Sequence, residues 1–169
     1  MPIAPDTKDW TWSAERRCDE CGFDPTTIGT ADIAPTLRRT ANRWVSFLGQ
    51  PRQWAKRPDE STWSPIEYAA HVRDVIRLYD QRLQLMLETD DPLYDNWDQD
   101  TAAEGYLEEE PRVVAGAIAA DSAVLAARFD SVADWSRPGR RSDGAQFTTE
   151  SFGRYFLHDL LHHLHDVRA

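Results

Sequence analysis

The chain has 169 residues, of which 41% are hydrophobic, and seven of them are Trp. This length and composition predict one domain that buries a substantial core, and they exclude an intrinsically disordered chain. The formal net charge of −10 predicts repulsion of nucleic acids and anionic lipids, so neither is expected as a partner. No apolar run approaches the roughly 20 residues of a membrane span. The opening MPIAPDTKDW has no apolar signal region, so a cytoplasmic protein is the default expectation.

The first thirty residues predict an irregular N-terminal arm, followed by a single bundle domain over residues 31–169. The arm holds the only two cysteines of the chain, Cys18 and Cys21. A CxxC pair supplies half of a four-ligand zinc site, which His163 or His165 would complete if the arm folds across the last helix. A thiol pair that responds to oxidation, or no special role, is comparably well supported by the sequence.

Four segments carry the hydrophobic spacing of helices, and the first runs from about Asp32 to Leu48, where Gly49 ends it. The second helix has the clearest start. Ser64 is a good N-cap, a proline occupies the first helical position, and Glu67 completes a capping box. This helix is expected to end near Thr89.

The third helix follows Pro111 and covers the alanine-rich stretch VVAGAIAADSAVLAARF, and the fourth begins at Thr148 or Thr149 and runs to the chain end. Residues 130–147 lie between them and hold the turn signals RPG and SDG, which predict a short hairpin. Four amphipathic helices without a strong strand pattern predict an all-α four-helix bundle.

The excess negative charge comes from one segment, since Leu83 to Pro111 contains ten Asp or Glu and no Lys or Arg. The loop LYDNWDQDT within it lacks the glycine and the ligand spacing of a calcium-binding loop. We predict that Trp97, Asp98 and Asp100 form the rim of a pocket that would bind a cationic or amine-bearing group. A merely solvated acidic loop is the alternative.

Four of the five histidines lie in RYFLHDLLHHLHDV, close to the chain end. On a helical wheel, His158, His162 and His165 lie within about 60° of one another, whereas His163 points toward the polar side. The i,i+4 spacing of His158 and His162 lets two imidazoles bind one ion. Because His71 lies on the inner face of the second helix, we predict that His71, His158 and His162 are the metal ligands. The alternatives are a hydrogen-bonded structural His71 and a solvated histidine-rich helix end.

These segments resemble the DinB-like superfamily, which includes mycothiol-dependent maleylpyruvate isomerases and related thiol transferases. WSPIEYAAHVRDV resembles the second-helix segment of that superfamily and RYFLHDLLHHLHDV the last-helix segment, over residues 31–167. The resemblance implies a DinB-type four-helix bundle, a metal held by one His of the second helix and a His-x-x-x-His pair of the last, and a homodimer. The stretch CDECGFD resembles an actinobacterial subgroup.

The predicted ligands suit Zn, Ni, Fe or Co, with Zn as the first expectation. An open position on the ion would either acidify a water for hydrolysis or bind a low-molecular-weight thiol as its thiolate. The resemblance favours the thiol, with mycothiol as the candidate cosubstrate, so we expect a thiol transferase or isomerase acting on a small molecule. A metal-dependent hydrolase, or a non-catalytic stress-response or ligand-binding protein with a structural metal, is the alternative. Asp74, three residues after His71, is the candidate base or orienting group, or else a surface partner of Arg73 or Arg77.

Overall fold

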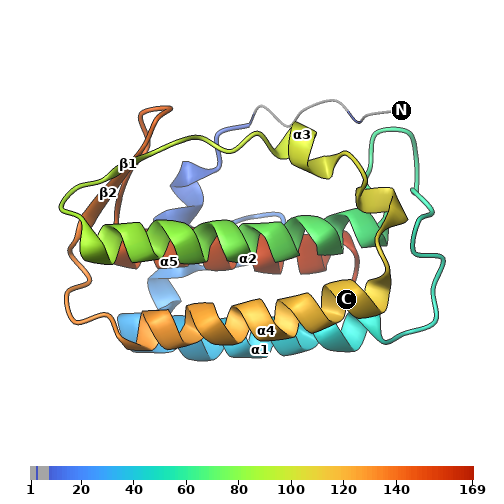
Figure 1. Cartoon of the computed structure of the whole chain (residues 1–169), viewed down its shortest axis with the longest axis horizontal. Coiled ribbons are helices and arrows are strands. Elements are labelled where there is room, and N and C mark those ends of the chain that lie inside the picture. Colours follow the sequence, from blue (N-terminus) through green and yellow to red (C-terminus); the bar gives the residue numbers. More distant parts are fainter. Residues whose placement is uncertain (1–2, 4–7) are drawn as a thin grey trace.

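The computed structural model describes residue 3 and residues 8–169, and its four long helices form a bundle (Figure 1). These helices are α1 (Thr30–Leu48), α2 (Pro65–Glu88), α4 (Pro111–Asp130) and α5 (Thr149–Asp166). Helices α1 and α2 each pack against both α4 and α5, so the cyclic order around the core is α1, α4, α2, α5. The predicted four-helix bundle is confirmed. Within residue 3 and residues 8–169, none of the helices combines the length and hydrophobicity needed to cross a membrane.

A small sheet closes one end of the bundle and includes the hairpin predicted for residues 130–147. Strand β2 (Pro138–Arg141) pairs antiparallel with β3 (Gln146–Thr148), and β1 (Leu93–Tyr94) pairs parallel with β2. The parallel pairing joins segments more than forty residues apart, and for this reason the local sequence pattern did not predict β1. The acidic segment also contains two short helical turns, α3 (Gln99–Ala103) and η3 (Tyr106–Glu108).

Local capping contacts determine where the long helices begin. At the start of α2, the Glu67 carboxylate accepts a hydrogen bond from the Ser64 N–H at 2.8 Å, as predicted for a capping box. Helix α5 starts after Thr148, whose hydroxyl accepts a hydrogen bond from the Ser151 N–H at 3.1 Å. Helix α1 begins at Thr30, two residues earlier than predicted, because the Asp32 carboxylate accepts a hydrogen bond from the preceding N-cap residue.

The core lies between the four helices and is rich in aromatic rings. Trp44 of α1 is fully buried, and its indole N–H donates a hydrogen bond to the Leu160 carbonyl of α5 at 3.2 Å. Gly153 allows α5 to approach α1 closely, because a Cβ at this position would lie 2.9 Å from the Ile33 Cδ1 atom. These contacts set the distance between α5 and its neighbours, and α5 carries most of the candidate site.

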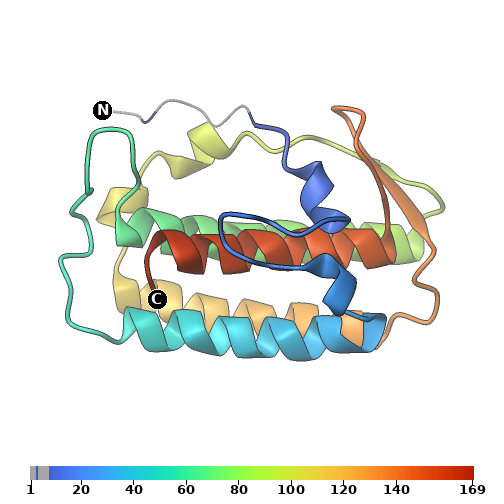
Figure 2. The ribbon, with the colours of Figure 1, turned by 180° about the vertical axis from the view of Figure 1, so that it is seen from behind.

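The N-terminal arm lies along the outer side of α5 (Figure 2). It contains two short 3-10 helices, η1 (Thr11–Ala14) and η2 (Pro25–Thr27), and both contact α5. Near the end of the arm, the Arg154 side chain of α5 donates a hydrogen bond to the Ile28 carbonyl at 2.9 Å. The arm is therefore packed on the bundle from residue 8 onward.

Candidate functional site

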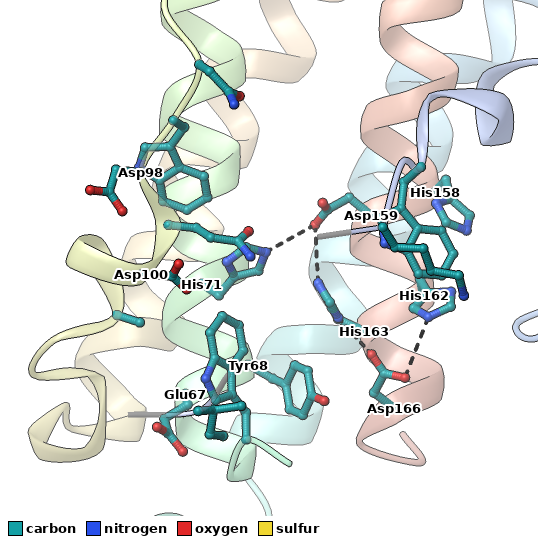
Figure 3. A pocket seen from close by; sticks show the side chains of 18 of the residues that line it. Glu67, Tyr68, His71, Asp98, Asp100, His158, Asp159, His162, His163 and Asp166 are labelled. Carbon is teal, nitrogen blue, oxygen red and sulfur yellow. Dashed lines mark hydrogen bonds and ion pairs between the residues drawn. The ribbon is translucent and has the colours of Figure 1, made fainter. Parts of the chain in front are cut away.

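A pocket of about 1330 Å³ opens between α2, α5, the acidic segment and the arm. His71 enters it from α2, and Asp159 and His163 enter it from α5 (Figure 3). Residues 96–100 of the acidic segment form part of its wall, and residues 8–11 of the arm form another part. Residues of the ranges 57–63 and 141–145 also line it, so stretches far apart in the sequence contribute to one cavity.

His71, Asp159 and His163 form a compact group whose candidate ligand atoms all lie within 4.8 Å of one another. The Asp159 Oδ1 atom lies 3.6 Å from the His71 Nε2 atom and 3.6 Å from the His163 Nε2 atom. Both distances exceed a normal hydrogen bond, and this buried oxygen accepts none within the described part of the chain. Atoms bound to one tetrahedral ion at about 2.1 Å lie about 3.4 Å apart. The group therefore fits the ligands of a single divalent ion.

Neighbouring side chains fix both imidazole rings of this group. The Nδ1 atom of His163 lies 2.8 Å from the Asp166 Oδ2 atom, and this contact turns Nε2 toward Asp159. Carboxylates commonly orient metal-binding imidazoles in this way. The ring of His71 stacks on Trp97 with a centroid distance of 5.4 Å and an interplanar angle of 24°. Trp63 packs against His71 at 5.2 Å, so two indoles confine the ring.

The electrostatics of the group suit metal binding. Burial lowers the pKa of His71, an effect that the nearby Asp159 carboxylate only partly offsets, so the ring is neutral at pH 7. Burial raises the pKa of Asp159, but the contact with His71 and the proximity of His163 together outweigh it and lower the pKa to about 2. A neutral imidazole and an ionised carboxylate are the protonation states that ligands must have.

All three predicted ligands line the pocket, but they fall into two separate ligand groups. His158 and His162 lie with Cys18 and Cys21 in a second group, while His71 lies with Asp159 and His163. In Figure 3, dashed lines join Asp159 to His71 and to His163, while His158 and His162 lie apart from them. One residue along a helix corresponds to a rotation of about 100°. His158 and His162 therefore face the arm, whereas the pair shifted by one residue faces α2. His163, which was expected to point to the polar side, contacts His71 with a ring centroid distance of 4.9 Å.

Asp74 does not lie where a base or orienting group for the pocket would act. Its Oδ1 atom accepts a hydrogen bond from the Arg73 Nε–H at 2.8 Å, and its Oδ2 atom accepts one from the Tyr106 hydroxyl at 2.7 Å. Asp74 is not among the described residues that line the pocket. It therefore joins α2 to η3, which agrees with the alternative interpretation of a partner for nearby arginines.

The acidic segment contributes its three predicted residues to the pocket wall, namely Trp97, Asp98 and Asp100. Asp98 also caps α3, because its carboxylate accepts a hydrogen bond from the Thr101 N–H at 3.0 Å. Asp159, in contrast, was not among the ligands predicted from the sequence. The sequence does contain a signal for Asp159, because Asp159 and His163 have the same i,i+4 spacing as the histidine pair and are displaced from it by one residue.

Comparisons with known proteins agree with this fold. The sequence model of the DinB superfamily matches residues 33–167. A solved structure described as "YfiT from Bacillus subtilis is a probable metal-dependent hydrolase with an unusual four-helix bundle topology" is similar with a TM-score of 0.72. The two sequences are 16% identical, and the likeness covers 82% of this chain and 84% of that chain. At this identity the likeness shows a shared fold. A comparison with curated protein sequences gives no match.

Proposed function

The chain belongs to the DinB superfamily, and we propose that it is a metal-dependent enzyme acting on a small molecule. The ion would be held by His71, Asp159 and His163. One observation carries the proposal: a buried Asp159 oxygen without a hydrogen bond in the described chain lies 3.6 Å from two imidazole nitrogens. A buried polar atom of this kind costs about 1–3 kcal/mol unless a partner satisfies it.

Two imidazoles and one carboxylate suit Zn, and also Fe, Ni or Co. Three protein ligands leave a position for substrate, where the ion supplies positive charge that favours the ionised form of a water or a thiol. Asp166 would hold the His163 ring in its binding orientation. Trp97 and Trp63 would shield His71 from water, since their rings pack on it.

The size and lining of the pocket support a thiol cosubstrate in addition to the substrate. A cavity of about 1330 Å³ exceeds the roughly 300–1,000 Å³ that holds one drug-sized ligand. Asp98, Asp100 and Glu104 line it, and their carboxylates would accept hydrogen bonds from the hydroxyl groups of a sugar-linked thiol such as mycothiol. In a thiol S-transferase reaction, the thiol would lose its proton to solvent, and its sulfur would bond to an electrophilic carbon of the second substrate as the leaving group, such as a halide, departs with the bonding electrons. In an isomerase reaction, the thiol would instead add to a carbon–carbon double bond and be eliminated again after rotation about that bond.

A metal-dependent hydrolase is the second candidate, because a catalytic ligand set of two His and one carboxylate also occurs in hydrolytic zinc enzymes. The structurally similar YfiT is itself described as a probable metal-dependent hydrolase. Turnover of an ester or amide without any thiol would favour this activity over thiol transfer. A stress-response or ligand-binding protein with a structural metal would show neither activity.

The test compares wild type with Asp159→Asn and His163→Ala. Metal bound per chain is measured by elemental analysis, and thiol-dependent loss of an electrophilic aryl halide is followed by absorbance. We expect both variants to lose one metal equivalent and the activity, because each removes one of three ligands. His165→Ala is the matched control, since its side chain is 55% exposed on the same turn and lies outside both ligand groups.

Full metal content in folded Asp159→Asn would contradict the ligand assignment. Metal loss with no thiol-dependent or thiol-independent turnover in wild type would instead support a non-catalytic metal-binding protein.

A further inference from the structure

The second group, Cys18, Cys21, His158 and His162, joins the arm to α5, and its candidate ligand atoms all lie within 4.8 Å of one another. We propose that these four side chains bind a structural zinc ion that fixes the arm to the bundle. This site shares no ligand with the pocket group described above. Two thiolates and two imidazoles form a complete tetrahedral set, which leaves no position for substrate.

The spacing of the candidate ligand atoms fits zinc. The Cys18 Sγ atom lies 3.7 Å from the His162 Nδ1 atom. Zinc bonds of about 2.3 Å to sulfur and about 2.05 Å to nitrogen, at a tetrahedral angle, separate the two ligand atoms by about 3.6 Å. Cys18 is fully buried, and His158 is 3% exposed. The charge of the ion would be neutralised by the two thiolates, so its burial would be tolerated.

The backbone around the cysteines forms a tight turn that directs both thiols to one side. The Cys18 N–H donates a hydrogen bond to the Phe23 carbonyl at 2.8 Å, and the Gly22 N–H donates one to the Cys18 carbonyl at 2.9 Å. Gly22 has a φ of 77°, a conformation that glycine adopts without strain. Backbone hydrogen bonds therefore form this turn, and they hold the two cysteines in place without an ion.

The two histidines have the surroundings of zinc ligands. While Nδ1 of His162 faces Cys18, its Nε2 atom lies 3.6 Å from a Glu20 carboxylate oxygen and 3.7 Å from an Asp166 carboxylate oxygen. Carboxylates in this position orient the ligand ring and raise its basicity. The Nε2 atom of His158 is buried without a hydrogen-bond partner in the described residues, and coordination accounts for such an atom.

The burial of Cys18 argues against a redox role for this thiol pair, in which Cys21 is half-buried. Both cysteines are free thiols, and the rings of Trp10 and Phe23 pack on His158 with centroid distances of 5.6 Å and 5.8 Å. Redox-sensor thiols are typically accessible to solvent, whereas Cys18 has no exposed surface. A disulfide between Cys18 and Cys21 would also leave His158 and His162, which face the arm, without a function.

The zinc site would support the pocket indirectly. Trp10 contacts both His158 and His162, and residues 8–11 form part of the pocket wall. An ion that holds the Cys18–Cys21 turn on α5 would therefore keep this wall in place. Loss of the ion is expected to loosen the arm while leaving the three pocket ligands intact.

The test uses the full-length protein loaded with Co²⁺ in place of Zn²⁺. Tetrahedral cobalt bound to cysteine gives a near-ultraviolet thiolate charge-transfer band, which cobalt at the pocket group would not give. We expect the band in wild type, Asp159→Asn and His165→Ala, and its loss in Cys18→Ser. Elemental analysis should show one metal equivalent fewer in Cys18→Ser than in wild type.

A second measurement on wild type guards against a variant that fails to fold. Zn²⁺ should slow the reaction of both thiols with a disulfide reagent by at least tenfold relative to chelator-treated protein. The proposal is overturned if cobalt-loaded wild type shows no thiolate band, or if both thiols react equally fast with and without Zn²⁺. A pocket-site failure would appear separately, as unchanged metal content in Asp159→Asn.

Discussion

Gly153→Ala tests the close contact that positions α5 against α1. The added methyl group would lie 2.9 Å from the Ile33 Cδ1 atom and 3.3 Å from the Phe129 Cε1 atom. Ile33 is fully buried and stiff at its branched Cβ, so it cannot move away easily. Overpacking of this kind costs about 1–3 kcal/mol, whereas replacing Gly by Ala inside a helix gains about 1 kcal/mol. We expect a net loss of up to about 2 kcal/mol in the free energy of unfolding.

Gly116→Ala is the matched control, because Gly116 is exposed within α4 and no atom lies within 4 Å of its added Cβ. This variant should gain about 1 kcal/mol from helix propensity alone. Urea unfolding followed by circular dichroism, with a chelator present, measures both variants without a contribution from bound metal. A Gly153→Ala variant that gains as much stability as Gly116→Ala would refute the tight contact between α5 and α1.

Three further predictions concern the pocket. Glu67→Gln should lower stability at pH 7 by about 2 kcal/mol. Burial raises the pKa of Glu67, but hydrogen bonds from Arg57 and the Ser64 N–H lower it by more. The carboxylate therefore stabilises the folded state fully above the pKa that Glu67 has in the unfolded chain. This stabilisation is lost as the pH falls through the pKa of Glu67 in the folded protein. Urea unfolding should therefore show the free energies of unfolding of wild type and variant converging as the pH falls below the ordinary Glu pKa of about 4.3; a constant difference would contradict this. Asp166→Asn should weaken metal binding about 10–100-fold in chelator competition, because it releases the His163 ring; unchanged affinity would contradict the role. Trp97→Ala should raise the KM for a substrate bound in the pocket by about tenfold without changing the thermal stability. An unchanged KM would count against a substrate contact at Trp97.

The helices could be predicted from the sequence because local contacts determine them. The capping box at Ser64 and Glu67 and the cap at Thr148 lie within one helical turn of the residues they serve. Strand β1 could not be predicted, since only its pairing with β2, far along the chain, makes it a strand.

The site was harder to predict because a helical wheel gives relative angles and not the absolute rotation of the helix. The last helix offers two i,i+4 pairs offset by one residue, His158 with His162 and Asp159 with His163. Which pair faces His71 depends on how the whole chain packs. The structure places the first pair against the arm that carries Cys18. The sequence indicates this only indirectly, through a CxxC motif that supplies two of the four ligands of a zinc site.

The one-residue offset on α5 has a consequence for how the protein would take up metal. Both ligand pairs, 158 with 162 and 159 with 163, belong to one stiff helix, so neither can rotate without the other. An ion that fixes the helix through one pair restricts the angular freedom of the second pair before its own ion arrives. Thermodynamic linkage makes this effect reciprocal, and each ion raises the affinity for the other by the same factor. Each site would still fill in a variant that lacks the other, but with a lower affinity than in wild type.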